Sequence, residues 1–275
     1  MKKLVALLVS IMVLCTCAAV SAEVQLGQSD YAAHGTKCFS VLTVAVDDGV
    51  IVDALIDEFQ MMDAAAATAV PNSEPMFPDE FAAGKVLASK RANAALYSTN
   101  MANNAGATLP LDVSYDSIEK FVIGKTVMEL ADAIAPFTEE TKADAIAMVD
   151  AVSSCTLADT YGYLSGLLDA AKKVTGCYTL YNVTGETLKE ITLTNNTTGE
   201  VKTVATDVAA DAVVPAMFTA PAGTVLTLSF TTEGGYTGTF DKLHIETAPI
   251  SLLAESAVDA ETHPTMISFS APEAK

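Results

Sequence analysis

Residues 150–156 read DAVSSCT and bring one carboxylate, three hydroxyls and one thiol together in a short stretch. The chain then runs into LADTYGYLSGLLDAAKK, where apolar residues recur three and four apart, as in an amphipathic helix. A hydroxyl at a helix start can cap the first turn. It can also carry a phosphate ester, because the free amides and the positive end of the helix favour an anion there. Thr156, followed by Asp159, fits either use.

The spacing of this stretch resembles the attachment signature of the FMN-binding domain family. That family includes the covalently flavinylated subunits of sodium-pumping quinone reductases and of related membrane electron-transfer complexes. Its signature is an acid, then Ser or Thr three residues later, then the acceptor Thr or Ser after three more. Asp150, Ser153 and Thr156 match these positions. Ser154 and Cys155 replace the usual Gly and Ala, and both are small.

The resemblance, which covers about residues 31–173, implies a function. A flavin transferase would esterify Thr156 with the phosphate of FMN taken from FAD, and Asp150 would orient the acceptor or be read by the transferase. The chain would then be an electron carrier that works with a redox partner protein at the membrane or cell surface. The alternatives are a surface binding or adhesion module built on a degenerate flavin domain, and a redox enzyme in its own right. No catalytic side chain is predicted.

A β-hairpin is the clearest element that would position this site. Runs of β-prone residues flank Asp47-Asp48-Gly49, and Asp-Gly between such runs is a strong hairpin signal. We expect strands at about 39–46 and 50–58, covered on both faces because both are largely apolar. The stretch VAVDDGVIVDALIDEF also resembles the opening strands of the family. Residues 60–84 contain three prolines and predict a long irregular connection that could shield a ligand.

Helical spacing predicts helices at roughly 84–101, 115–134 and 138–149, with a last helix that ends near residue 173. From Gly176 onward, short alternating runs and glycine turns predict a small antiparallel sandwich. We therefore predict three parts. Residues 1–22 are a signal peptide, and residues 23–174 are an α+β FMN-binding-like domain with an antiparallel sheet and several helices. Residues 175–275 are an all-β sandwich-like domain that resembles no family.

The first 22 residues have two lysines, an apolar run and a small-residue end, which is the layout of a signal peptide. We therefore expect an extracellular or cell-surface protein, with a lipid anchor at Cys17 as the less favoured alternative. The net charge of −19 disfavours nucleic-acid binding. Three histidines without a close pair give little support to a metal site.

Other residues are secondary candidates for the site. Ala105-Gly106-Ala107-Thr108 resembles the end of the signature but lacks its acid and first hydroxyl, so Thr108 ranks below Thr156. Lys90 and Arg91 could approach a phosphate or a ring oxygen, or lie on a solvated helix face. Gly124-Lys125-Thr126 is predicted to be helix interior, since it lacks the glycine spacing of a phosphate loop. Several rings could flank a flavin or simply be core: Tyr31, His34, Phe59, Tyr97, Tyr161 and Tyr163.

Overall fold

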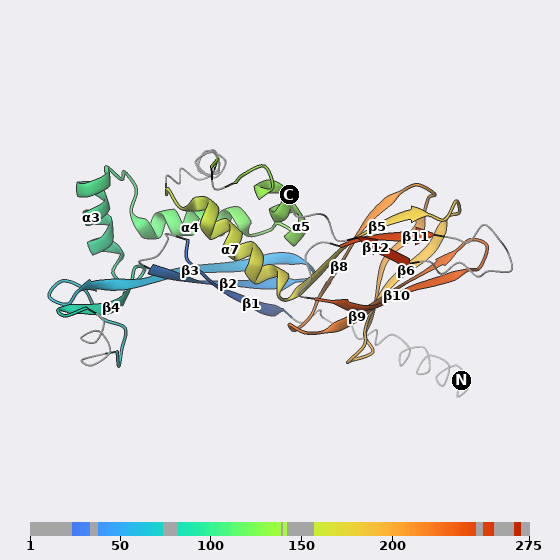
Figure 1. Cartoon of the computed structure of the whole chain (residues 1–275), viewed down its shortest axis with the longest axis horizontal. Helices are drawn as coiled ribbons and strands as arrows, with labels where there is room; N and C mark the ends of the chain where they lie inside the picture. The colour runs from blue at the N-terminus through green and yellow to red at the C-terminus, as the bar shows by residue number, and fades with distance from the viewer. Residues whose placement is uncertain are drawn as a thin grey trace, which may run out of the picture.

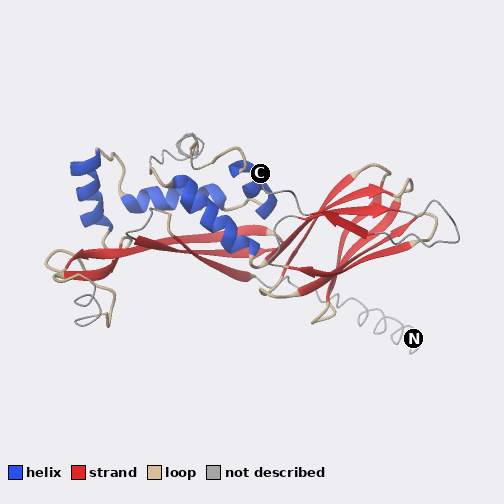
Figure 2. Cartoon of the chain, in the orientation of Figure 1, coloured by secondary structure: helices blue, strands red, loops and turns tan. Residues whose placement is uncertain are grey.

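The computed structural model combines an N-terminal α+β part with a C-terminal part built of strands (Figure 1). In Figure 2 the described helices all lie in the N-terminal part. None of them is long and apolar enough to cross a membrane. The predicted signal peptide, Cys17, His34 and residues 150–156 lie outside the described residues, which are 24–33, 38–73, 82–138, 140–141, 157–245, 250–255 and 267–270.

The N-terminal sheet has the strand order β1-β2-β3-β4, with each neighbouring pair antiparallel. Asp48 and Gly49 have φ values of 47° and 78°, as a two-residue type I′ turn requires, so the predicted hairpin is confirmed. Its second strand ends at residue 63, beyond the predicted end, because its last residues pair with β4. The strands are β1 (Gln25–Tyr31), β2 (Cys38–Asp47), β3 (Val50–Asp63) and β4 (Lys85–Ser89).

Two of the predicted helices are wrong in part. The predicted helix at 84–101 begins as β4, and only its second half is helical. The one predicted at 115–134 is two helices, separated at Gly124, whose φ is 85° and whose amide donates to the Ile51 carbonyl. Thr126 then caps the next helix with its side chain. The described helices are α3 (Ala94–Ala105), α4 (Leu111–Val122), α5 (Val127–Ile134) and α7 (Thr160–Lys172).

The predicted helix at 138–149 lies largely outside the described residues, and residues 140–141 form a turn. The last helix is confirmed. It packs on the sheet very closely, since a Cβ at Gly27 would lie 2.0 Å from the Ala170 carbonyl oxygen of α7. Inward-facing Leu42, Val44 and Val46 of β2 share a core with this helix and with α4.

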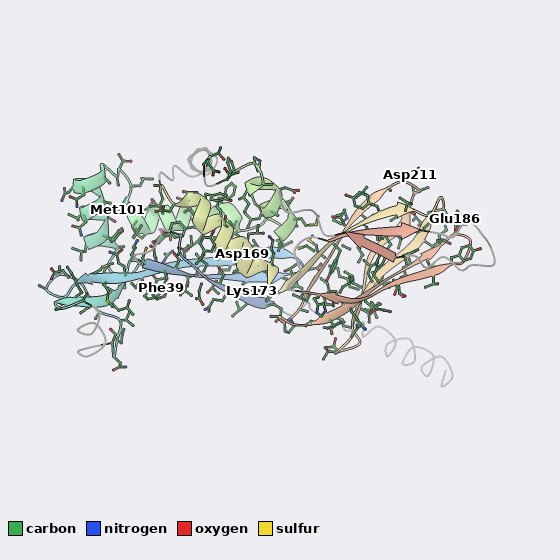
Figure 3. All side chains as sticks on the ribbon, in the orientation of Figure 1. Phe39, Met101, Asp169, Lys173, Glu186 and Asp211 are labelled. Carbon is green, nitrogen blue, oxygen red and sulfur yellow. The ribbon has the colours of Figure 1, made fainter. Side chains whose placement is uncertain are left out.

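The other face of the N-terminal sheet is exposed in the described structure, so the expectation of cover on both faces is wrong. Leu26 is 70% exposed, Phe39 46% and Leu55 50%. Phe39 and Phe59 stack there with ring centroids 5.4 Å apart. In Figure 3, Phe39 lies on the side of the sheet away from α7. The described helices cover only one face of the sheet. Because successive side chains of a strand point to opposite faces, every second side chain has no described element packed against it.

The C-terminal part has two four-stranded sheets, ordered β10-β9-β6-β7 and β12-β11-β5-β8. Buried side chains from both sheets form one core, including Leu180, Leu228 and Phe240. The predicted turns at 185, 199, 223 and 235 each have a glycine with positive φ. The pairing of β11 with β5 is parallel, unlike the antiparallel arrangement predicted. The strands are β5 (Thr175–Val183), β6 (Leu188–Asn195), β7 (Val201–Val208), β8 (Val213–Thr219), β9 (Val225–Thr232), β10 (Thr237–His244), β11 (Ile250–Glu255) and β12 (Ile267–Ser270).

The two parts meet at the hairpin tip. The Gly49 amide donates to Thr219 Oγ1 at 2.5 Å, and Asp48 forms an ion pair with Lys202. Lys202 also donates to the Met217 carbonyl oxygen at 3.2 Å. The chain itself passes from α7 to β5 with only residues 173 and 174 between them.

Candidate functional site

A cavity of about 870 Å³ lies between α3, the loop after it, the start of α7 and the end of β3. Its floor is formed by buried side chains, and its rim by exposed residues of α3 and the following loop. Met101, labelled in Figure 3, lies on the α3 wall. The lining residues are Gln60, Lys90, Tyr97, Asn100, Met101, Asn104, Ala105, Gly106, Ala107, Thr108, Leu111, Leu157, Ala158, Asp159 and Tyr163.

Helix α3 forms one wall of the cavity. Hydrogen bonds hold it at both ends, and none of its residues is buried, so its side chains are open to the cavity. Asn93 precedes the helix, and its side-chain amide donates to the carbonyls of Ser89 and Thr68 at 2.9 and 3.0 Å. Ser98 Oγ accepts a hydrogen bond from the Leu111 amide, which joins α3 to the start of α4. Gly106 ends the helix with a φ of 67°, a left-handed conformation that glycine adopts without strain. The loop can therefore turn back along the cavity.

A buried ion pair lies at the floor of the cavity. Lys90 Nζ is 2.7 Å from Glu58 Oε1, and the two side chains are 2% and 0% exposed. Glu58 Oε2 accepts hydrogen bonds from Tyr163 and, at 3.2 Å, from Tyr115. Cys38 Sγ lies 4.0 Å from Lys90 Nζ. Buried charges need partners, and in this cluster both carboxylate oxygens of Glu58 have them.

The ion pair keeps both of its members charged. Burial by itself would raise the pKa of Glu58, but the Lys90 ammonium and the hydrogen bonds to the carboxylate bring it below its ordinary value. Burial would lower the pKa of Lys90, and Glu58 raises it above its ordinary value. Burial and the neighbouring Tyr115 and Glu58 raise the pKa of Tyr163, so its hydroxyl stays a donor. Burial also raises the pKa of the Cys38 thiol to about 12.

The neighbouring Arg91 contacts other elements of the fold and does not line the cavity. It pairs with Asp116 at 3.1 Å and with Glu119, and its Nε donates to the Ile56 carbonyl at 2.8 Å. These contacts join α4 to β3. Neither Lys90 nor Arg91 lies on a solvated helix face, so that alternative is wrong, and Lys90 is the one that reaches the cavity.

Asp150, Ser153, Ser154, Cys155 and Thr156 lie outside the described residues. The three residues that follow them, 157–159, all line the cavity. Helix α7 begins only at residue 160, with residue 159 as its N-cap, so the prediction that the helix starts at the motif is wrong by about four residues. The secondary candidate, residues 105–108, lines the same cavity from the opposite loop.

Two of the aromatic candidates, Tyr97 and Tyr163, line the cavity. Tyr31 packs against the N-terminal core, and Phe59 lies on the exposed face of the sheet. Sequence reasoning missed Glu58. Its signal was present, however, because Glu58 shares strand parity with the inward-facing Ala54 and Ile56. An acid at such a position needs a buried partner.

Among the described residues, no group of His, Cys, Asp and Glu side chains could hold a metal ion. Cys38 and Cys177 are buried free thiols. The Ser40 hydroxyl, on the strand residue that pairs with Glu58, is buried without a hydrogen-bond partner in this part of the chain.

No family model matches the chain, and no curated protein matches it. Among solved structures, the chain is similar to one described as "NMR structure of the protein from Eubacterium rectale". The two are 20% identical, and the match covers 38% of this chain and 95% of the other, with a TM-score of 0.28. A likeness this weak assigns no fold and no function.

Proposed function

We propose that this chain is an exported flavoprotein that carries FMN on Thr156 and relays electrons to or from a redox partner at the cell surface. The observation that carries the proposal is the adjacency of motif and cavity. Leu157, Ala158 and Asp159 line the cavity, and they directly follow the motif in the sequence. The match of Asp150, Ser153 and Thr156 to the attachment signature supports the same conclusion.

The cavity fits a three-ring cofactor in size and in chemistry. Its volume of about 870 Å³ lies within the roughly 300–1,000 Å³ typical of small-molecule sites. Tyr97 and Met101 offer apolar contact to a planar ring, and Asn100 and Asn104 offer amides to its polar edge. Lys90 supplies a positive charge at the floor.

Attachment would be a group transfer by a separate flavin transferase. The Thr156 hydroxyl loses its proton and forms a P–O bond with the FMN phosphorus of FAD, while the pyrophosphate bond breaks and AMP leaves. The attached ring would supply the redox chemistry. In this proposal the N-terminal part is an FMN-binding-like domain that presents the flavin to the redox partner, and the β-rich part is a sandwich-like module that docks to a partner at the cell surface.

The test is coexpression with a flavin transferase, followed by absorption spectroscopy of the denatured, washed protein and mass spectrometry of its peptides. We expect a retained flavin spectrum and added FMN phosphoryl mass on the peptide that contains Thr156. Thr156→Ala should abolish both, whereas Thr141→Ala, in an exposed turn, should keep both. The proposal is wrong if a known acceptor is modified while this chain is not, or if the mass is on the Thr108 peptide.

The alternative function, a surface binding or adhesion module on a degenerate flavin scaffold, is favoured by one observation. The exposed sheet face presents Leu26, Phe39 and Leu55 to solvent. This alternative predicts a colourless protein whose binding to cells or matrix is unchanged by Thr156→Ala. Flavinylation of the wild-type chain would count against it.

A further inference from the structure

The cavity floor presents a single cation. Lys90 is the one basic side chain among the described residues that line the cavity, and Asp159, near the rim, is the one acid. Lys90 Nζ lies 4.6 Å from the centroid of the Tyr97 ring, which is also part of the wall. A ring placed in the cavity would therefore meet a positive charge at the floor.

The two charges of the ion pair lie at different distances from the cavity. Glu58 is not a lining residue, and its carboxylate is occupied by Lys90, Tyr115 and Tyr163. Lys90 lines the cavity and Glu58 does not, so the cation is the nearer of the two charges to a ring bound there. An ammonium has three N–H donors, of which one is directed at Glu58 Oε1 at 2.7 Å and another at Cys38 Sγ at 4.0 Å. A carbonyl or an anionic edge in the cavity could accept from the same group.

A positive charge at this position acts differently on the two redox states of a flavin. Two electrons and one proton, taken up by the neutral oxidised ring, leave a reduced ring with one net negative charge. A nearby cation stabilises that charge, and the interaction is stronger in a poorly hydrated site than in water. Glu58, farther from the ring, opposes part of the effect.

We propose, as an inference that rests on the proposed function, that Lys90 raises the reduction potential of the flavin in this cavity and that Glu58 limits the increase. The electrons come from a donor protein of lower potential, and the proton from solvent. By setting the reduction potential of the flavin, Lys90 determines which donor proteins can reduce it. Its role is electrostatic, so the covalent attachment at Thr156 does not depend on it.

The experiment is a spectroelectrochemical titration of the flavinylated protein and four variants. Lys90→Met should lower the midpoint potential. Glu58→Gln should raise it, measured below the pH at which the unpaired Lys90 ammonium loses its proton, because the positive charge is then no longer offset. The double variant Glu58→Gln/Lys90→Met should lie below both wild type and Glu58→Gln. We expect a change of at least tenfold in the reduced-to-oxidised ratio between Glu58→Gln and the double variant, or about 30 mV for a two-electron couple. Lys85→Met, at an exposed ion pair with Asp63, is the matched control and should leave the potential unchanged.

The outcomes separate this inference from the proposed function. A yellow protein whose double variant matches or exceeds the potential of the wild type overturns the assignment of Lys90 and leaves flavinylation standing. A Glu58→Gln potential at or below that of the double variant, measured below the pH at which the unpaired ammonium loses its proton, also overturns the assignment. A wild-type chain that takes up no flavin overturns both proposals. The double variant leaves no lone buried charge, so its comparison with wild type keeps the test decisive if either single variant does not fold.

Discussion

Replacing Lys90 by methionine should destabilise the fold strongly, because it leaves the Glu58 carboxylate charged and unpaired. Glu58 is fully buried, and two tyrosine hydroxyls cannot replace the ammonium. Removing one partner of a buried pair typically costs about 3–5 kcal/mol. For a chain of this size, about 1 kcal/mol shifts the midpoint of thermal unfolding by roughly 2–4 °C. We therefore expect Lys90→Met to lower it by about 6–20 °C.

The double variant Glu58→Gln/Lys90→Met should recover part of this loss. A glutamine carbonyl still accepts from Tyr115 and Tyr163, and no charge remains to be solvated. The coupling free energy in the double-mutant cycle should be about 1–3 kcal/mol. Lys85→Met, whose ion pair with Asp63 is largely exposed, should change the stability by no more than about 1 kcal/mol.

The pair also predicts how stability depends on pH. The pKa of Glu58 is lowered from 4.5, so its contribution is complete above pH 4.5 and is lost as the pH falls through the lower, folded value. The pKa of Lys90 is raised from 10.5, so its contribution is complete below pH 10.5 and is lost as the pH rises through the higher, folded value. The difference between wild type and double variant should therefore be flat between these limits.

Circular dichroism during thermal and urea unfolding measures these differences, and hydrogen exchange of β3 and α4 localises them. The β-rich part serves as the internal control, since it contains none of the changed residues. A Lys90→Met variant within about 1 kcal/mol of wild type, or a cycle without coupling, would show that the two side chains do not form a buried pair.

Three further predictions concern Gly27, Cys38 and Lys202. Gly27→Ala should destabilise by about 1–3 kcal/mol or more in urea unfolding, because its Cβ would lie 2.0 Å from the Ala170 carbonyl oxygen; an unchanged midpoint would contradict the close packing of α7. Cys38 should react with a thiol reagent at pH 8 only after denaturation, because burial raises its pKa to about 12; fast labelling of native protein would refute this. Lys202→Met should cost only about 0.2–1 kcal/mol, because its ion pair with Asp48 is solvent-accessible; a larger loss in thermal unfolding would mean that this contact holds the two parts together.

The sequence predicted the elements whose signals are local. The Asp48-Gly49 turn requires positive φ at two adjacent residues, and few sequences suit it, so the hairpin was recognisable. The same holds for the glycine turns of the β-rich part. In contrast, β4 has apolar residues that also fit a helix, and only its pairing with the end of β3 makes it a strand.

The site was predictable only in part, since most of it depends on distant pairing. Gly124 breaks a helical pattern because its amide pairs with Ile51, far back in the sequence. Lys90 could be chosen as a cation near the site, but its partner could not, because Glu58 and Lys90 meet only through the pairing of β3 with β4. The walls on α3 and at residues 157–159 come together only in the fold.

The junction between the two parts has a mechanical consequence. Two residues join α7 to β5, and the hairpin tip is held against Thr219 and Lys202 at the same place. Relative movement of the two parts would therefore have to change both the short link and the contacts at the hairpin tip. Helix α3, which lines the cavity, lies at the end of the molecule away from the β-rich part (Figure 1). A protein that binds the β-rich part would therefore lie away from the cavity, and a second protein that contacts the cavity would approach the opposite end of the molecule.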